Sequence, residues 1–469
     1  MKHSLYFRAA VAALLLLPSQ SMWADTPEKG ISESMLSRLR QGYAQNPNHK
    51  ALRNAMAGNA IDVLAVNAEN RNNFDTHFSH EVKSKGITNQ KNSGRCWLFT
   101  GLNVLRSQII ATYDLGELKL SQNYNFFYDQ LEKSNLFLQG IIDYASRPAD
   151  DKMVEWLMRN PLSDGGQFTG IADNISKYGI VPAEVMTESF AAENTPRLNA
   201  LLSLKLREDA LELRGMHASG KSGKEINRRK EQMLAEVYRM LALTLGEPPL
   251  EFTWTRKDKD GKVVDTRRYT PQQFYREYAG NDLKNGYVML MNDPSRPYHR
   301  LYEIDYDRHS YDGSNWTYVN LPVEEIKQMA IASIKDSTMM YFSCDVGKFL
   351  DRERGFLDPG NYDYESLMGT SFGMDKAERI RTFASASSHA MTLMAVDLDE
   401  NGRPKKWKVE NSWGEGANDG HLIMTDRWFD EYMFRLVIDK KYATPATLEI
   451  LKQKPEKLPA WDPMFSEER

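Results

Sequence analysis

The chain has 469 residues, of which 41% are hydrophobic and 26% are charged, and its formal net charge at pH 7 is −4. These proportions are those of ordinary globular proteins, and the length allows a large hydrophobic core divided over two or three lobes. A net charge this close to zero gives no electrostatic reason to expect nucleic acid or an anionic membrane as the main partner. We therefore expect no nucleic-acid partner.

The start of the chain has the layout of a secretory signal peptide. Lys2 and Arg8 precede an apolar run over residues 9–17, and the segment ends on Ala24. The run is shorter than the roughly 20 residues that a membrane-spanning helix needs. An uncleaved N-terminal anchor or a buried helix is the alternative. We predict cleavage near Ala24, with Ser21 as the second choice. The mature protein is then exported, periplasmic or secreted, and is not held at a membrane.

The pattern of apolar and polar residues divides the chain into six segments. One of them is charge-rich and has helical periodicity, with a capping box formed by Ser222 and Glu225 and a glycine stop at Gly246. We predict, in chain order, a signal peptide (1–24), an N-terminal helical arm (25–80), a helical lobe (81–190), an inserted helical lobe (191–335), a β lobe (336–445) and a C-terminal arm (446–469).

The chain contains only two cysteines, Cys96 and Cys344. Cys96 begins a stretch to Ile110 that is apolar on nearly every side, which predicts a buried helix with the cysteine in its first turn. Free backbone N–H groups at a helix start favour a thiolate there. Cys344 ends the apolar run 340–344, which predicts a buried strand and an inert thiol. A Cys96–Cys344 disulfide or redox pair is the alternative.

Strand signals dominate after residue 338. The apolar run 391–396 is followed by an Asn-Gly turn at 399–402, and further strands are predicted at 407–410 and 421–425. The first two strands then form a hairpin. His389 precedes one strand of that hairpin and Asn411 ends the other, so we expect the hairpin to bring these two side chains together.

Gln90, Cys96, His389 and Asn411 together supply the groups that a thiol peptidase needs. A cysteine nucleophile requires a base to ionise it, a group to orient that base, and donors for the developing oxyanion. His389 would be the base and Asn411 its orienting group. Gln90 and the Cys96 backbone N–H would be the oxyanion donors. His77 and His80 lack further ligands at metal-binding spacing, so we expect no metal and no cofactor.

Around these residues the chain resembles the bleomycin hydrolase and aminopeptidase C group of papain-like cysteine peptidases. The resemblance covers about residues 31–464 and rests on several distinctive strings. These strings are Thr88-Asn89-Gln90, Ser93-Gly94-Arg95-Cys96-Trp97, Asp164-Gly165-Gly166-Gln167, Tyr178-Gly179-Ile180-Val181-Pro182, His389-Ala390-Met391-Thr392, Val409-Glu410-Asn411-Ser412-Trp413-Gly414 and Pro459-Ala460-Trp461-Asp462-Pro463-Met464. His389 follows Cys96 by far more than the roughly 130–150 residues of ordinary papain-like enzymes, which fits the predicted insertion.

The resemblance implies an α+β fold with a helical lobe, an antiparallel β-barrel-like lobe and a cleft between them. It implies that Gly165 and Gly166 pair with the substrate backbone and that Trp413 shields the His389–Asn411 contact. It also implies a homohexamer, and a C-terminal arm that blocks one side of the cleft and makes the enzyme an aminopeptidase for peptides with a free N-terminus. Two features depart from the group, which is usually cytosolic and whose arm ends in small apolar residues. This chain has an export signal and ends Phe465-Ser466-Glu467-Glu468-Arg469.

Two other functions remain open from the sequence. A relaxed C-terminal arm would give an endopeptidase or omega-peptidase, in which case a free substrate N-terminus would not be required. Alternatively, the fold could serve a catalytically silent papain-like binding protein. The complete set of Gln90, Cys96, His389 and Asn411 favours the peptidase.

Overall fold

The computed structural model describes residues 29–44, 48–72, 75–280 and 282–465. The chain divides into two compact units, Met1–Ala65 and Val66–Arg469. In the first unit the described residues form the helices α1 (Glu33–Ala44), α2 (His49–Gly58) and α3 (Ile61–Ala65). The predicted signal peptide (1–24) and the last four residues of the predicted arm lie outside the described residues. Among the helices that are described, none combines the length and the apolar character that crossing a bilayer requires.

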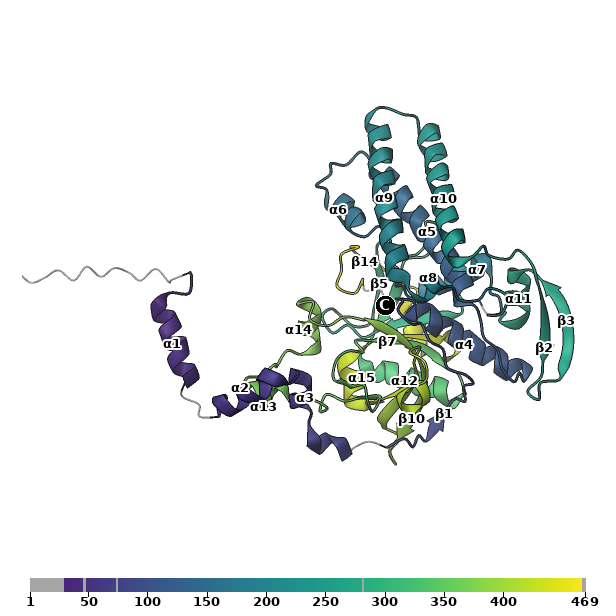
Figure 1. Cartoon of the computed structure of the whole chain (residues 1–469). Helices are drawn as coiled ribbons and strands as arrows, with labels where there is room; N and C mark the ends of the chain where they lie inside the picture. The colour runs from purple at the N-terminus through teal and green to yellow at the C-terminus, as the bar shows by residue number, and fades with distance from the viewer. Residues whose placement is uncertain (1–28, 45–47, 73–74, 281, 466–469) are drawn as a thin grey trace, which may run out of the picture. The chain divides into compact units, whose positions relative to one another are not determined.

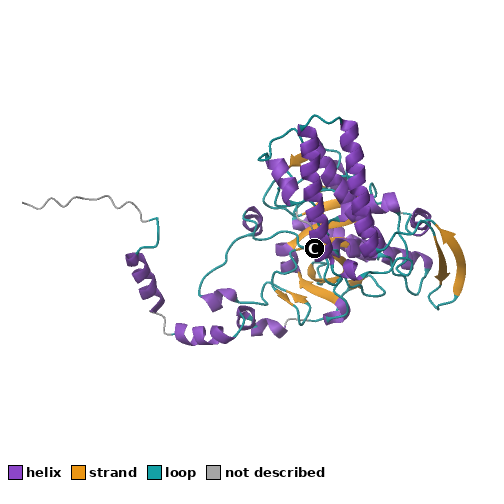
Figure 2. Ribbon diagram, turned by 45° about the horizontal axis from the view of Figure 1, so that its top comes forward, coloured by secondary structure: helices purple, strands orange, loops and turns teal. Residues whose placement is uncertain are grey.

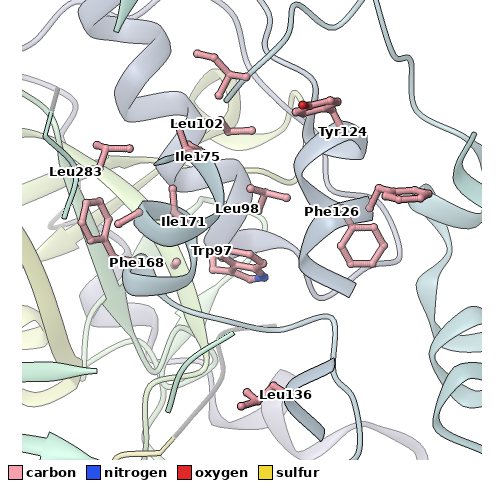
Figure 3. Close-up of a cluster of buried hydrophobic side chains, with 14 of the residues drawn as sticks. Trp97, Leu98, Leu102, Tyr124, Phe126, Leu136, Phe168, Ile171, Ile175 and Leu283 are labelled. Atoms are coloured by element: carbon pink, nitrogen blue, oxygen red, sulfur yellow. The ribbon is translucent and has the colours of Figure 1, made fainter. Parts of the chain in front are cut away.

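The second unit begins with a short 3-10 helix and a short strand, and then becomes helical (Figure 1). Its first helix, α4, starts at Cys96, as the sequence predicts, and packs against α7. Gly101 permits this contact, because a Cβ there would lie 2.3 Å from the Cδ1 of Ile171. Figure 3 shows Trp97 and Leu98 of α4 beside Ile171 of α7. The elements of this part are η1 (Ala68–Asn72), β1 (His80–Glu81), α4 (Cys96–Tyr113), α5 (Gln122–Asp143), α6 (Lys152–Arg159), α7 (Phe168–Tyr178) and α8 (Phe190–Glu193).

The next two helices, α9 (Thr195–Ala218) and α10 (Gly223–Leu245), lie side by side as an antiparallel hairpin (Figures 1 and 2). The predicted capping box is confirmed: the Ser222 side chain accepts from the N–H of Glu225, and the Glu225 carboxylate accepts from the N–H of Ser222. Gly246 caps the C-terminus of α10 with a φ of 90°, a conformation that favours glycine.

The segment 191–335, predicted as an inserted helical lobe, is only partly helical. Beyond α10 it forms a separate two-stranded ribbon and then three strands of the main sheet. The prediction of a helical lobe over the whole segment is therefore wrong. Helical periodicity identified α9 and α10, but their signal does not extend to the short strands that follow. These elements are β2 (Phe252–Lys257), β3 (Val263–Tyr269), α11 (Pro271–Tyr278), β4 (Tyr287–Met291), β5 (Arg300–Ile304), β6 (Thr317–Asn320) and α12 (Val323–Lys335).

The main sheet of the described residues has the strand order β14-β5-β6-β4-β13-β7-β10-β11-β12-β9-β8, and β1 pairs with β10 beside this path. It is an open sheet, mostly antiparallel, rather than a closed barrel. The predicted hairpin is confirmed, with Thr392 opposite Glu410. The elements from β7 on are β7 (Met340–Cys344), β8 (Leu350–Asp351), β9 (Phe356–Leu357), α13 (Tyr364–Met368), α14 (Lys376–Arg381), β10 (His389–Leu398), β11 (Pro404–Glu410), η2 (Ala417–Gly420), β12 (His421–Thr425), α15 (Asp426–Tyr432), β13 (Met433–Asp439), η3 (Lys440–Tyr442), α16 (Pro445–Ile450) and β14 (Glu456–Leu458).

The buried apolar side chains form two separate cores. Cys96 and Trp97 belong to the core of the helical part, whereas Met391 and Leu393 of β10 belong to the core of the β part. Ala390, between His389 and Met391, belongs to the helical core. Successive side chains of a strand point to opposite faces of the sheet, so β10 contributes to both cores. The predicted two-lobe α+β fold is confirmed, and the lobes meet at the start of β10.

A buried ion pair joins the two lobes next to the site. The Arg106 guanidinium of α4 lies 2.6 Å from the Glu410 carboxylate at the end of β11, and their side chains are 2% and 0% exposed. The hydroxyl of Ser84 also donates to Glu410, and Arg106 donates to the Gly86 carbonyl oxygen at 3.2 Å. Since Arg106 is on the helix that begins with Cys96 and Glu410 directly precedes Asn411, this pair connects the elements that carry the predicted site.

We expect Arg106→Met to lower the free energy of unfolding by about 3–5 kcal/mol, because it leaves the Glu410 carboxylate buried without its cation. The matched control is Arg159→Met, which removes an exposed pair with Glu155 whose side chains are 73% and 50% exposed. That change should cost less than about 1 kcal/mol. Urea denaturation followed by tryptophan fluorescence measures both, and equal losses of stability in the two variants would contradict the prediction.

Candidate active site

The loop before α4 fixes the position of Cys96, whose side chain is fully buried. Asp164 organises this loop: its carboxylate accepts from the Gly94 N–H at 2.7 Å, and its carbonyl oxygen accepts from the Trp97 indole N–H at 2.8 Å. A Cβ at position 94 would lie 2.6 Å from the Asp164 carboxylate, so glycine is required there. Cys96 is thereby held at the first turn of α4, where the helix dipole favours an anionic sulfur.

His389 begins β10 and lies between Cys96 and Asn411. The N–H of Ala390, the next residue, lies 3.5 Å from the Sγ of Cys96. The Nε2 of His389 lies 2.8 Å from the Oδ1 of Asn411, which also accepts from the Ser412 N–H at 2.8 Å. Because an amide oxygen only accepts hydrogen bonds, Nε2 carries a proton and donates. The other ring nitrogen, Nδ1, is then the one that can exchange a proton with a neighbouring thiol.

Trp413 covers the histidine. The centroids of the His389 and Trp413 rings are 4.9 Å apart and the ring planes are inclined by 31°. The guanidinium carbon of Arg352, an exposed residue, lies 5.1 Å from the Trp413 ring centroid. The indole therefore contacts both the His389 ring and a cation. An apolar shield of this kind keeps water from competing for the His389–Asn411 hydrogen bond.

The amide of Gln90 is held from both ends. Its Oε1 accepts from the Ser412 hydroxyl at 2.6 Å, and its Nε2 donates to the Ser93 carbonyl oxygen at 2.6 Å. The Gln90 backbone N–H donates to the Ser412 carbonyl oxygen at 2.8 Å. A glutamine amide has two N–H groups, and among the described residues only one of them is used, by Ser93. The second is a preorganised donor beside the Cys96 loop.

Gly165 and Gly166 are buried directly after Asp164, and so lie next to Trp97. The Gly165 N–H donates to the Ser163 hydroxyl at 3.0 Å. A Cβ on Gly166 would lie 2.8 Å from the Cδ2 of Trp97, which makes glycine necessary at this position. The sequence string containing both glycines is thus brought to the Cys96 side of the site.

The segment that leads into His389 is also polar and buried. The hydroxyl of Ser385 donates to the carboxylate of Asp345 at 2.7 Å, and the Ser387 hydroxyl donates to that of Ser343 at 3.0 Å. Burial raises the pKa of Asp345, and the hydrogen bond from Ser385 opposes this shift only in part. Asp345 follows Cys344, whose Cα pairs with that of His389 across the sheet. The structure contains no disulfide between Cys344 and Cys96.

A cavity of about 630 Å³ adjoins the site and is bounded by the described part of the C-terminal arm. Its lining includes Ser163 and Ala386, which neighbour site residues in the sequence, and Trp461, Asp462 and Phe465 of the arm. Arg296 pairs with Asp462 at 3.0 Å. The buried Arg435 donates to the Met464 carbonyl oxygen at 2.7 Å, and the Phe465 ring packs against Trp156 with their centroids 5.3 Å apart. The arm is therefore anchored as far as Phe465.

The structure brings Cys96, His389, Asn411, Gln90 and Trp413 together, with Gly165 and Gly166 beside Trp97. Sequence reasoning missed Asp164 and Ser412 as organisers of the site. Asp164 and Ser412 stand inside the distinctive strings, so the sequence marked these positions as notable. It did not indicate which residues their side chains contact. Among the described residues no group of three or more His, Cys, Asp or Glu side chains has the arrangement of a metal site.

Comparison with known proteins gives consistent matches over nearly the whole chain. The family model described as Peptidase C1-like family matches residues 30–465. The chain is 37% identical to "Aminopeptidase C" of Listeria monocytogenes over 434 residues, covering 92% of this chain and 97% of that protein. It is 41% identical to human "Bleomycin hydrolase" over 400 residues, covering 82% and 88%. The crystal structure of PepW from Lactobacillus rhamnosis HN001 is similar, with a TM-score of 0.90, 38% identity, and coverage of 94% and 99%.

Proposed function

Because the chain belongs to the Peptidase C1-like family and is a cysteine-type peptidase, we propose that it is an exported aminopeptidase that hydrolyses peptides near their free N-terminus. The observation that carries the proposal is the contact chain from Cys96 through β10 to Asn411. The Ala390 N–H lies 3.5 Å from Cys96 Sγ, and the His389 ring lies 2.8 Å from Asn411. Relatives named aminopeptidase C and bleomycin hydrolase support the aminopeptidase activity.

In the proposed mechanism Cys96 and His389 exchange one proton to form a thiolate and an imidazolium. The thiolate attacks the peptide carbonyl carbon, and the resulting oxyanion accepts hydrogen bonds from the Gln90 amide and the Cys96 N–H. His389 then protonates the leaving amine as the C–N bond breaks, which leaves an acyl-enzyme on Cys96. Water hydrolyses this thioester with His389 as the base. Asn411 holds the imidazole in place throughout.

The C-terminal arm is proposed to select the free N-terminus. The described arm borders the cavity next to Ser163 and Ala386, and it is anchored there by Arg296 and Arg435. A terminal carboxylate on a short continuation of this arm would form a charge-assisted hydrogen bond with a substrate ammonium and so fix the distance from the N-terminus to the cleaved bond. The backbones of Gly165 and Gly166 would bind the extended substrate.

Export and assembly are parts of the same proposal. The signal-peptide layout of residues 1–24 supports export, to the periplasm or outside the cell. The resemblance to the bleomycin hydrolase group supports a homohexamer. Peptides with a free N-terminus are the proposed partners, and no cofactor is required by the mechanism, because the thiol, the imidazole and the amide donors carry out each step.

We expect Cys96→Ala to abolish peptide hydrolysis and His389→Ala to be nearly as damaging. Asn411→Ala should be milder, with a loss in kcat below the roughly 10²–10⁴-fold that general acid–base catalysis contributes, because Asn411 makes and breaks no bond. Cys344→Ala, at the other buried cysteine, is the matched control and should keep activity. Steady-state kinetics on a fluorogenic peptide measures all four variants, and undiminished activity of Cys96→Ala would refute the mechanism.

The role of the arm is tested by one peptide fluorophore prepared with a free and with an acetylated amine. The intact chain should hydrolyse the free-amine form faster. Deletion of residues 465–469 should slow that reaction and speed hydrolysis of the acetylated form, because the terminal carboxylate then lies at Met464, too far back along the arm to reach the substrate ammonium. Asp462→Asn weakens the anchor to Arg296 without shortening the chain. It should lower the ratio of the free-amine rate to the acetylated rate, as the deletion does. A ratio unchanged by the deletion would favour the relaxed-arm endopeptidase.

Export predicts a mature N-terminus near Asp25 in protein recovered from its native host. Mass spectrometry of the exported fraction measures it. As a control, Leu14→Arg interrupts the apolar run and should leave the precursor uncleaved inside the cell, because an arginine within so short a run prevents its insertion. Recovery of the native chain with Met1 intact in the cytosol would reject the export proposal while leaving the peptidase proposal untouched.

A further inference from the structure

Three titratable side chains, two on α5 and one from a loop far along the chain, meet in the helical lobe, close to the site. Asp129 and Lys133 lie one turn apart on α5, and the Lys133 ammonium is 3.0 Å from the Asp129 carboxylate. The Nδ1 of His309, in the connection between β5 and β6, is 2.5 Å from the other carboxylate oxygen of Asp129. The three side chains are between 0% and 7% exposed, so the cluster is shielded from bulk water.

Lys133 connects this cluster to the segment that is proposed to bind substrate. Its ammonium donates to the carbonyl oxygens of Ser163, at 3.1 Å, and Gly165, at 2.5 Å. The side-chain amide of Gln130, a neighbour on α5, donates to the same Ser163 oxygen at 3.0 Å. Three N–H donors therefore hold two carbonyl oxygens of one loop, those of Ser163 and Gly165. An ammonium is a stronger donor than a neutral amide, so this fixes the loop firmly.

His309 braces the same segment from its other side. Its ring makes an edge-on contact with Trp97, with centroids 4.7 Å apart. A Cβ at Gly166 would lie 2.2 Å from the Cε1 of His309, and a Cβ at Gly170 would lie 2.2 Å from its Nδ1. The ring thus fills the space left by two glycines. Together the contacts of Lys133 and His309 determine where the backbone of residues 163–166 lies relative to Trp97, the residue after Cys96.

The electrostatics of the cluster favour the charged form of Asp129 despite its burial. Burial alone would raise the pKa of Asp129, but the charges of Lys133 and His309 outweigh it and lower that pKa below its usual range. Burying charges costs free energy that a well-packed apolar cluster would not cost. None of the three side chains is required for the proposed chemistry at Cys96. A costly buried cluster attached to one loop is best explained by what it does to that loop.

We propose that Asp129, Lys133 and His309 are positioning residues that hold the backbone of Gly165 and Gly166 in the geometry that binds an extended peptide. This inference rests on the proposed function, because it assigns the cluster to substrate binding at the same site. The cluster would act on binding of the peptide and leave the reactivity of Cys96 unaffected. Lys133 also lines the cavity beside the arm, so the support lies at the wall of the space that a peptide would enter.

The test uses two readouts on the full-length mature protein. The rate of Cys96 alkylation by iodoacetamide reports thiolate reactivity without peptide binding. The concentration of a free-amine peptide analogue with a reduced, non-hydrolysable bond that halves this rate reports peptide binding without turnover. We expect Lys133→Met to raise the half-protecting concentration and KM at least tenfold, with the alkylation rate within twofold of the unsubstituted protein. The double variant Lys133→Met/Asp129→Asn removes the ammonium and the carboxylate together, and His309 can remain beside them as a neutral imidazole. It should show the same shift if the single variant does not fold.

Lys327→Met is the matched control, because Lys327 is equally buried and pairs with Asp430 at 2.5 Å in the β lobe. It should leave both readouts unchanged in protein that remains folded by circular dichroism. A half-protecting concentration within twofold in the Lys133 variants would overturn the inference, as would a parallel fall in alkylation rate. Failure of both variants to fold would assign the cluster to stability and also overturn it. Absence of alkylation at Cys96 in the unsubstituted protein would instead refute the proposed function.

Discussion

The site depends on one constraint: its thiol lies on a helix of one hydrophobic core, and its imidazole begins a strand that packs mostly in the other. Cys96 starts a helix of the helical core. His389 starts a strand whose next residue, Ala390, packs in that same core, whereas the apolar residues from Met391 to Val396 pack in the core of the β part. Their separation is therefore set by how the lobes pack, rather than by either lobe alone. The Arg106–Glu410 pair lies at this junction, one residue before Asn411, and is shielded from water. An ion pair whose geometry is fixed at 2.6 Å tolerates less sliding than an apolar contact, so it can define the register between α4 and β11.

Much of this arrangement follows from local sequence signals. The helix that begins at Cys96, the hairpin of β10 and β11, and the capped start of α10 at Ser222 each have a periodicity or a terminal residue that identifies them. The partners of Cys96 are also visible, because Gln90, His389 and Asn411 stand in distinctive strings. These parts were predictable because the physical reason for each lies within a few residues of the chain.

The parts that could not be predicted depend on contacts between distant residues. Strands β4, β5 and β6 are only four or five residues long and pair within the sheet of the β lobe, although they follow the α9–α10 hairpin in sequence. Periodicity over so few residues does not separate a core strand from a loop. Likewise, Asp129 and Lys133 appear in sequence as an ordinary pair one helical turn apart. Only the fold brings His309 to Asp129 and places the carbonyl oxygens of Ser163 and Gly165 within hydrogen-bond distance of the Lys133 ammonium.

The charges around the cavity bear on how a free N-terminus would be selected. Lys133, Arg159 and Arg308 line it, and Asp462 is the one acidic residue among its described lining. Asp462 is already bound by Arg296, at 3.0 Å. Lys133 and Arg159 are likewise bound by carboxylates, those of Asp129 and Glu155. A substrate ammonium entering here would therefore find no available carboxylate among the described residues that line the cavity, which is unfavourable in a partly buried space. The favourable counter-charge must then come from elsewhere, and the arm continues past Phe465 at the cavity wall. Under the proposed function, this electrostatic requirement is the reason that the C-terminal carboxylate of the arm is the group to which the selection of a free N-terminus is assigned.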